Sequence, residues 1–160
     1  MHKIFYPLMA AALFILSSCG SNDTQQNAHV HHAPNGDLQE ETASLEKLPS
    51  FLDHLSPEVV TAYTAAGKLK DTLQWIPCFC GCGESAGHKS NLNCFINSVR
   101  EDGSVVWDDH GTRCGVCLEI AITAAQLKQQ GASTLEIRQL IDRQYSSGYG
   151  NPTVTPMPNA

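Results

Sequence analysis

Six cysteines fall into three short groups, and this spacing constrains the fold more than any other feature of the sequence. The groups are Cys78-Phe79-Cys80-Gly81-Cys82, the single Cys94, and Cys114-Gly115-Val116-Cys117. Clustered cysteines indicate a disulfide framework, a metal site or redox chemistry, and each of these requires sulfurs from separate segments to meet. We therefore expect three distant pieces of the chain to converge on one site.

The N-terminus has the pattern of a signal peptide over residues 1–18. Lys3 precedes a mostly apolar run from Ile4 to Leu16, which is too short to span a bilayer comfortably. The sequence Leu16-Ser17-Ser18-Cys19 matches the bacterial lipoprotein pattern, in which the thiol of Cys19 accepts diacylglycerol. The alternative is an ordinary secretory peptide with Cys19 at its boundary.

We expect Cys19 to carry acyl chains such as palmitate, because two or more chains make membrane attachment stable. The membrane is then a partner through Cys19, and the protein is expected to be a lipoprotein of the bacterial cell envelope, outside the cytoplasm. That compartment is oxidising, so neighbouring thiols become disulfides there unless a metal ion or a reductant holds them.

Residues 19–44 contain almost no large apolar side chain. Burial of so little apolar surface cannot offset the conformational entropy lost on folding, so we expect this segment to be a flexible tether. Three imidazoles lie close together in it, at His29, His31 and His32. Such a tract is an auxiliary chelate for Cu(II), Zn or Ni even in an unfolded chain. The alternative is a polar linker with incidental histidines.

A folded cysteine-rich domain is predicted over residues 45–150, followed by a proline-rich tail over 151–160. Ser56 and Pro57 have the pattern of a helix start, with a hydroxyl cap and a proline at the first helical position. A second helix is expected to begin near Cys114 and to end at Gly131. A third begins directly afterwards, since Ser133-Thr134-Leu135-Glu136 is a capping box.

Asp102-Gly103 is a good two-residue hairpin turn between apolar segments that end in Ile96 and Trp107. The fold expected from these elements is a mainly α, small helical domain. It would have three to four helices, a short β-hairpin and a cysteine-rich loop.

The charge balance excludes one class of function. The chain of 160 residues has ten Lys and Arg against sixteen Asp and Glu, a formal net charge of -6, and no basic cluster. Proteins that bind nucleic acids need a basic stripe to displace counterions from phosphate. We therefore expect no nucleic-acid partner.

The favoured interpretation of the cysteines is a site for a soft metal ion. Thiolates select Cu(I), Zn or an iron–sulfur cluster, and Cu(I) is expected first and Zn second, because bound Cu(I) protects thiols outside the cytoplasm. A metal donor or acceptor protein is then an expected partner. Two histidines interleave with the cysteines, so the candidate ligands are Cys78, Cys80, Cys82, Cys94, Cys114, Cys117, His88 and His110.

Two alternatives stay open. One is a disulfide-stapled structural lipoprotein, although a Cys-x-Cys pair is not expected to close easily on itself. The other is thiol–disulfide exchange through Cys114 and Cys117, where a helix start favours thiolate. The chain shows no Ser-His-Asp or paired-carboxylate pattern, which favours a binding protein over an enzyme.

The cysteine groups belong to a longer pattern: Pro77-Cys78-Phe79-Cys80-Gly81-Cys82-Gly83, then Gly87-His88-Lys89-Ser90-Asn91, Cys94 and the later Cys114-x-x-Cys117. This pattern resembles the PCYCGC-motif family of bacterial lipoproteins. The resemblance covers most of the chain after residue 49, with Phe79 where the motif has Tyr. It implies a lipid-anchored extracytoplasmic protein of unknown function.

The C-terminal half is also similar to the haem-lyase subunit of cytochrome c maturation, a family that reduces apocytochrome thiols. That similarity implies a redox role for Cys114 and Cys117.

Overall fold

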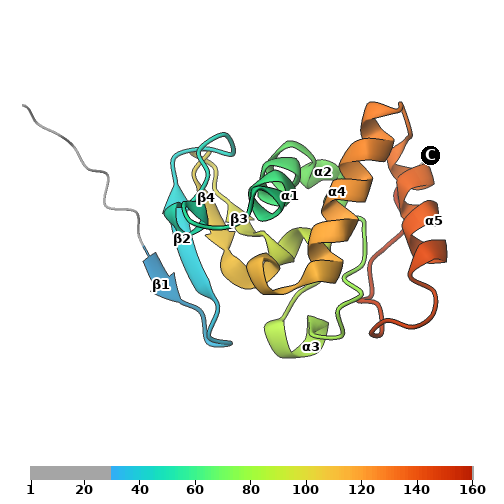
Figure 1. The fold of residues 1–160 in the computed structure, drawn as a ribbon, viewed down its shortest axis with the longest axis horizontal. Coiled ribbons are helices and arrows are strands. Elements are labelled where there is room, and N and C mark those ends of the chain that lie inside the picture. The colour runs from blue at the N-terminus through green and yellow to red at the C-terminus, as the bar shows by residue number, and fades with distance from the viewer. Residues whose placement is uncertain (1–29, 160) are drawn as a thin grey trace, which may run out of the picture.

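The computed structural model describes residues 30–159, which form an antiparallel sheet with helices stacked on one side of it (Figure 1). Its four strands lie in the order β1 (Val30–His32), β2 (Leu38–Thr42), β4 (Val105–Asp108) and β3 (Ile96–Val99). The main helices are α1 (Pro57–Lys68), α4 (Gly115–Gln129) and α5 (Thr134–Gln144). The connections hold the short helices α2 (Lys70–Leu73) and α3 (Gly83–Ala86) and the 3₁₀ turns η1 (Ser50–Leu52), η2 (Asn91–Cys94) and η3 (Asp109–Arg113).

The expectation of a mainly α fold was wrong, because the chain is mixed α and β. The expected hairpin is present as β3 and β4, with Gly103 at positive φ in its turn, but β2 and β1 extend it into a sheet. Strand β2 has the sequence Leu-Gln-Glu-Glu-Thr, without the apolar alternation that predicts a strand. Its polar side chains are satisfied by hydrogen bonds, as when Gln39 Nε2 donates to Asp108 Oδ2 at 2.8 Å.

The N-terminal strands lie in the stretch expected to be a mobile tether. The tether was expected over residues 19–44, whereas residues 30–32 and 38–42 pair as the hairpin β1–β2. The expected signal peptide (1–18), Cys19 and His29 lie outside the described residues. Within residues 30–159, no helix has the length and apolar character needed to cross a membrane.

The local signals for the long helices are confirmed. Ser56 caps α1 and Pro57 takes its first position, while Ser133 and Glu136 form the capping box of α5. Gly131 follows α4 with a φ of 89°, a conformation that favours glycine. These features depend only on neighbouring residues, which is why the sequence predicts them well.

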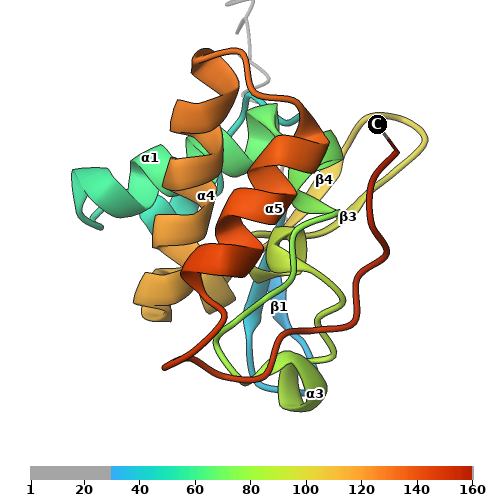
Figure 2. The ribbon, with the colours of Figure 1, turned by 90° about the vertical axis from the view of Figure 1, so that its right-hand side faces the viewer.

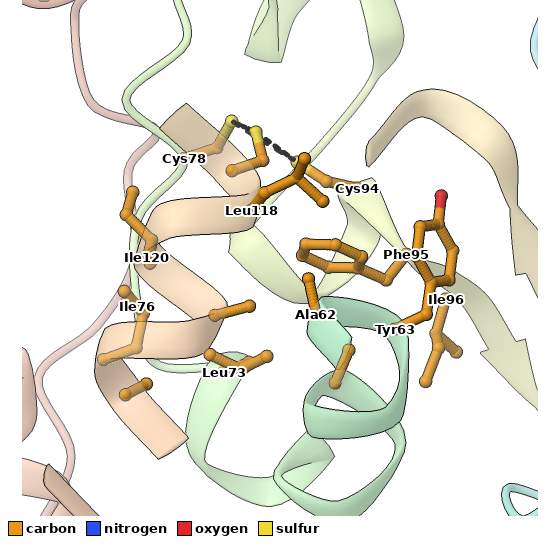
Figure 3. Packing of buried hydrophobic residues seen from close by; sticks show 14 of the residues in the cluster. Ala62, Tyr63, Leu73, Ile76, Cys78, Cys94, Phe95, Ile96, Leu118 and Ile120 are labelled. Atoms are coloured by element: carbon orange, nitrogen blue, oxygen red, sulfur yellow. Dashed lines mark hydrogen bonds between the residues drawn. The ribbon is translucent and has the colours of Figure 1, made fainter. Parts of the chain in front are cut away.

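Tyr63 of α1 joins the helices to the sheet at the centre of the core. Its ring packs edge-on against Phe51 and Phe95, with ring centroids 5.7 and 5.0 Å apart, and it also contacts Trp107 of β4. Its hydroxyl donates to the carbonyl oxygen of Asp108 at 2.7 Å. Figure 3 shows the same apolar cluster continuing along α4 to the sulfurs of Cys78 and Cys94.

The proline-rich tail packs against the first cysteine group. The N–H groups of Gly150 and Thr153 donate to the carbonyl oxygens of Phe79 and Cys78, each at 3.0 Å. The Cys78 N–H donates in return to Thr153 Oγ1 at 2.9 Å. Figure 2 shows the tail, in dark red, running past α3. The tail therefore holds the backbone that carries Cys78 in place.

Candidate functional site

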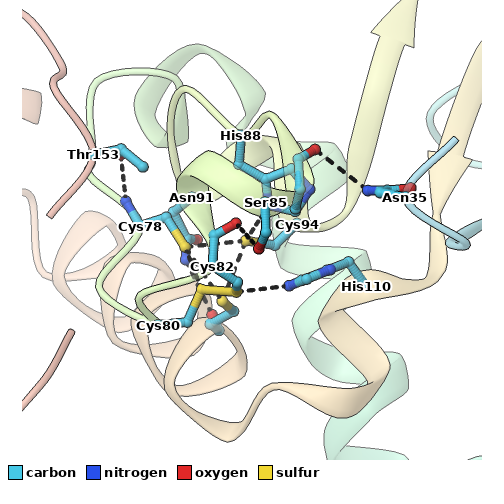
Figure 4. Close-up of a disulfide and its surroundings, with 12 residues drawn as sticks. Asn35, Cys78, Cys80, Cys82, Ser85, His88, Asn91, Cys94, His110 and Thr153 are labelled. Carbon is cyan, nitrogen blue, oxygen red and sulfur yellow. Dashed lines mark hydrogen bonds between the residues drawn. A yellow bond between two sulfur atoms is a disulfide. The ribbon is translucent and has the colours of Figure 1, made fainter. Parts of the chain in front are cut away.

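Cysteines from three separate segments meet at one end of α4 (Figure 4). Cys78 comes from the loop before α3, Cys94 ends η2, and Cys117 lies in the first turn of α4. The Cys78 sulfur lies 3.6 Å from that of Cys94 and 3.8 Å from that of Cys117, and the Cys117 and Cys94 sulfurs are 3.2 Å apart. We call these three buried residues the inner thiols.

The neighbouring Cys80 and Cys82 form a disulfide. The expectation that such a pair would not close easily on itself was wrong. Gly81 between them has a φ of 81°, and this left-handed residue folds the chain so that the two Cα atoms are 5.5 Å apart. Among the described residues, Cys78, Cys94, Cys114 and Cys117 stay free.

Both candidate histidines lie against sulfur. His88 Nδ1 is 3.5 Å from the sulfur of Cys94, and His110 Nε2 is 3.1 Å from that of Cys82. The two rings contact each other edge to face, with centroids 4.5 Å apart. His88 is buried, whereas His110 keeps 15% of its side-chain surface exposed.

Asp37 belongs to the same site, and the sequence interpretation missed it. Its Oδ2 lies 3.1 Å from His110 Nδ1, and its carboxylate also accepts hydrogen bonds from Arg113 and from Asn35 Nδ2. A carboxylate only accepts, so the Nδ1 of His110 carries the proton and Nε2 faces sulfur. Metal-binding histidines commonly have such a carboxylate behind them. The signal that could have found Asp37 is Asn35-Gly36, a hairpin turn directly before it.

Hydrogen bonds between the sulfurs lower the pKa of some thiols in the cluster and raise the pKa of others. Hydrogen bonds from Cys117 and Cys94 lower the pKa of Cys78 far below that of an ordinary thiol. The Cys117 thiol likewise lowers the pKa of Cys114 to about 6. Hydrogen bonds to Cys114, Cys78 and Cys94, together with burial, raise the pKa of Cys117. The cluster therefore holds thiolates, the form that binds metal ions and attacks disulfides.

The cluster can bind a metal ion or form disulfides. Three overlapping groups that contain cysteine have their donor atoms within 4.8 Å of one another: Cys78 with Cys80 and Cys117, Cys78 with His88 and Cys94, and Cys80 with Cys82 and His110. Cys114 adjoins this set through its hydrogen bond with Cys117.

His31 and His32 do not reach the sulfurs. They lie exposed on β1 and line a cleft of about 620 Å³, and His32 Nδ1 is 3.3 Å from the carbonyl oxygen of Gly36. His88 lines the same cleft, together with Asp108. The cleft therefore connects the exposed histidines of β1 with the residue that contacts Cys94.

The family described as "Protein of unknown function with PCYCGC motif" matches residues 8–158. Neither the curated proteins nor the solved structures contain a significant match to the chain.

Proposed function

The chain belongs to the family of proteins with the PCYCGC motif, and since that family is described as of unknown function, we propose from its site that the protein binds a soft metal ion. The preferred ion is Cu(I), and Zn is the second candidate. The ligands are the clustered cysteines with His88 and His110. The protein stores or delivers this ion rather than transforming a substrate with it.

The spacing of the inner thiols is the observation that carries this proposal. Their three sulfurs lie between 3.2 and 3.8 Å apart. Four thiolates bound tetrahedrally at about 2.3 Å from one Zn ion lie about 3.8 Å from one another. Three distant segments thus present sulfurs near the spacing that ligands of one ion require, in a site where burial excludes oxidants.

Two polar features around the sulfurs support the proposal. Asp37 holds His110 in the tautomer whose Nε2 can bind a metal ion, as carboxylates behind metal-binding histidines commonly do. Asn91, whose Nδ2 donates to the Cys117 carbonyl, has a buried Oδ1 without a hydrogen-bond partner among the described residues. Buried acceptors are normally satisfied, so the site has capacity for a further bound group.

Copper is favoured over zinc by the number and softness of the donors. Reduction of the Cys80–Cys82 disulfide gives six thiols in one cluster, more than one tetrahedral Zn ion uses. Cu(I) prefers soft sulfur ligands, and bridging sulfurs allow more than one ion to be bound. A disulfide-stapled scaffold is disfavoured, because four cysteines of the described residues are free.

The location follows from the N-terminal pattern. We infer that Cys19 is acylated and that the protein is anchored on the outer side of a bacterial membrane, where a donor or acceptor protein exchanges the metal ion with it. Growth with a labelled fatty acid tests this anchor. The full-length protein should take up the label and the Cys19→Ser variant should not, and a labelled Cys19→Ser variant would contradict the inference.

Competition for Cu(I) tests the proposed function. Reduced, metal-free protein is titrated anaerobically against a chromogenic Cu(I) chelator, and separately against one for Zn. The protein should withdraw both ions, and Cys94→Ala should weaken binding at least tenfold.

His88→Ala should likewise weaken binding, and His54→Ala is its matched control, because His54 is exposed outside the cluster. The control should bind like the unchanged protein, and circular dichroism checks that each variant folds. Failure of the unchanged protein to compete, or equal binding by Cys94→Ala, would overturn the proposal.

A further inference from the structure

A free thiol, a disulfide and a histidine follow one another at the outer side of the cluster. The sulfur of Cys78 lies 2.9 Å from the sulfur of Cys80. Cys80 is bonded to Cys82, and the sulfur of Cys82 lies 3.1 Å from His110 Nε2. The attacking sulfur, the sulfur to be attacked and a group beside the departing sulfur are therefore all in contact.

We propose that the Cys80–Cys82 disulfide exchanges with Cys78 inside the protein and thereby releases Cys82 as a nucleophile towards external disulfides. In the first step, the Cys78 sulfur attacks the Cys80 sulfur. A Cys78–Cys80 bond forms, the Cys80–Cys82 bond breaks, and the electron pair leaves with Cys82. Cys78 reacts as a thiolate and Cys82 departs as a thiolate, so charge is conserved and no oxidant or reductant is consumed.

The position of the attacking sulfur decides which of the two bonded sulfurs departs. Cys82 has His110 Nε2 beside it, and the Cys80 sulfur has the attacking sulfur of Cys78 beside it. Attack on the Cys80 sulfur expels Cys82, because Cys82 is the sulfur bonded to it. Asp37 is a positioning residue, because its bond to Nδ1 fixes the orientation of the His110 ring. Nucleophile, base and orienting carboxylate are the arrangement by which proteins activate a cysteine.

Exposure decides where an external reactant meets the protein. Cys78 keeps only 1% of its surface exposed, so it acts inside the cluster and not on a bulky substrate. Cys82 and His110 are half-buried and open to the surface. The released Cys82 thiolate then attacks an external disulfide, forms a mixed disulfide with one half and expels the other half as a thiolate. The substrate class is a disulfide of a small thiol or of a protein surface.

This exchange does not depend on metal binding, but it uses one of the inner thiols. A metal ion bound to Cys78 would remove the attacking thiolate. The test therefore uses metal-free protein, so that failure of the exchange and failure of metal binding are separate results.

Peptide mapping after reaction with glutathione disulfide tests the exchange. Full-length, metal-free protein carrying the single disulfide is incubated with the probe and quenched with acid. Free thiols are alkylated, and the peptides are identified by mass spectrometry. The expected products are glutathione on Cys82 and a new Cys78–Cys80 disulfide. Cys114 provides an internal reference, because it is a half-buried thiol outside the exchanging trio.

Three variants complete the test. Cys78→Ser should reduce glutathione on Cys82 at least tenfold while labelling of Cys114 continues. His110→Gln and Asp37→Asn should slow labelling of Cys82 relative to Cys114, a ratio that general destabilisation would not lower. Equal labelling of Cys82 in Cys78→Ser, or labelling of Cys114 without Cys82 in the unchanged protein, would overturn the proposal.

Discussion

The Oδ2 atom of Asp37 lies 3.1 Å from the Nδ1 atom of His110, although the two residues are 73 positions apart in the chain. Asp37 precedes β2 and His110 lies in η3, so the N-terminal hairpin completes a site whose sulfurs all come from residues 78–117. The hairpin is thus part of the candidate site.

Asp37→Asn should weaken metal binding while the fold is kept. The amide keeps the shape of the side chain but loses the negative charge that fixes the His110 tautomer and pairs with Arg113. Loss of such a partner typically costs about 10- to 100-fold in metal affinity. Chelator competition measures this, with Asp53→Asn on the exposed surface as the matched control. Binding by Asp37→Asn equal to that of the control would show that Asp37 does not support the site.

Thr42→Val should destabilise the fold by detaching β2 from β4. The Thr42 hydroxyl accepts a hydrogen bond from Trp107 Nε1 at 2.8 Å, and the Trp107 side chain is fully buried. Leaving a buried donor without a partner costs about 1–3 kcal/mol in the free energy of unfolding. Urea unfolding measures the loss. The exposed Thr61→Val in α1 is the control and should change stability by less than about 0.5 kcal/mol; equal effects would refute the role of this bond.

Gly150→Ala should separate the tail from the cysteine loop. A Cβ atom at residue 150 would lie 2.4 Å from the backbone nitrogen of Gly81 and 2.8 Å from the carbonyl carbon of Cys80, so the backbone would have to shift. Overpacking of this kind costs about 1–3 kcal/mol in the free energy of unfolding, and metal affinity should fall with it. Gly115→Ala is the control, because nothing lies within 4 Å of its Cβ position. Unchanged stability and affinity in Gly150→Ala would contradict the packing of the tail.

Alkylation of Cys114 should depend on pH with a midpoint near 6. The hydrogen bond from Cys117 lowers the pKa of Cys114 to about 6, so the reactive thiolate predominates above that pH and is lost below it. Because the folded pKa is the lower one, this group stabilises the fold at pH values above the unfolded pKa. That contribution disappears as the pH falls through 6.

Iodoacetamide rates on metal-free protein, resolved by peptide mapping, measure the midpoint. Cys117→Ala removes the donor and should move the midpoint towards the ordinary thiol value of about 8.5. A midpoint at the ordinary value in the unchanged protein would contradict the prediction.

Local signals made much of the chain predictable from its sequence. The caps at Ser56, Ser133 and Gly131 and the turn at Gly103 depend on residues within a few positions, and each is present. The grouping of the cysteines also indicated which segments would meet. That these cysteines, His88 and His110 act as metal ligands stays a prediction.

Long-range polar contacts were not predictable in the same way. The polar side chains of strand β2 are satisfied by Asp108 and Trp107, which are remote in the sequence, and by Ser50, which follows Glu40 by ten positions. The Cys80–Cys82 disulfide depends on the positive φ of Gly81, which spacing alone does not reveal. Both features changed the interpretation, one of the fold class and one of the cysteine chemistry.

The most direct measurement of the central claim is elemental analysis of the full-length protein purified anaerobically, with free thiols counted in the same sample. We predict at least one copper ion per chain, or zinc where copper is scarce, with the inner thiols protected from alkylation until the metal is removed. Metal well below one ion per chain together with no free thiol would contradict the account.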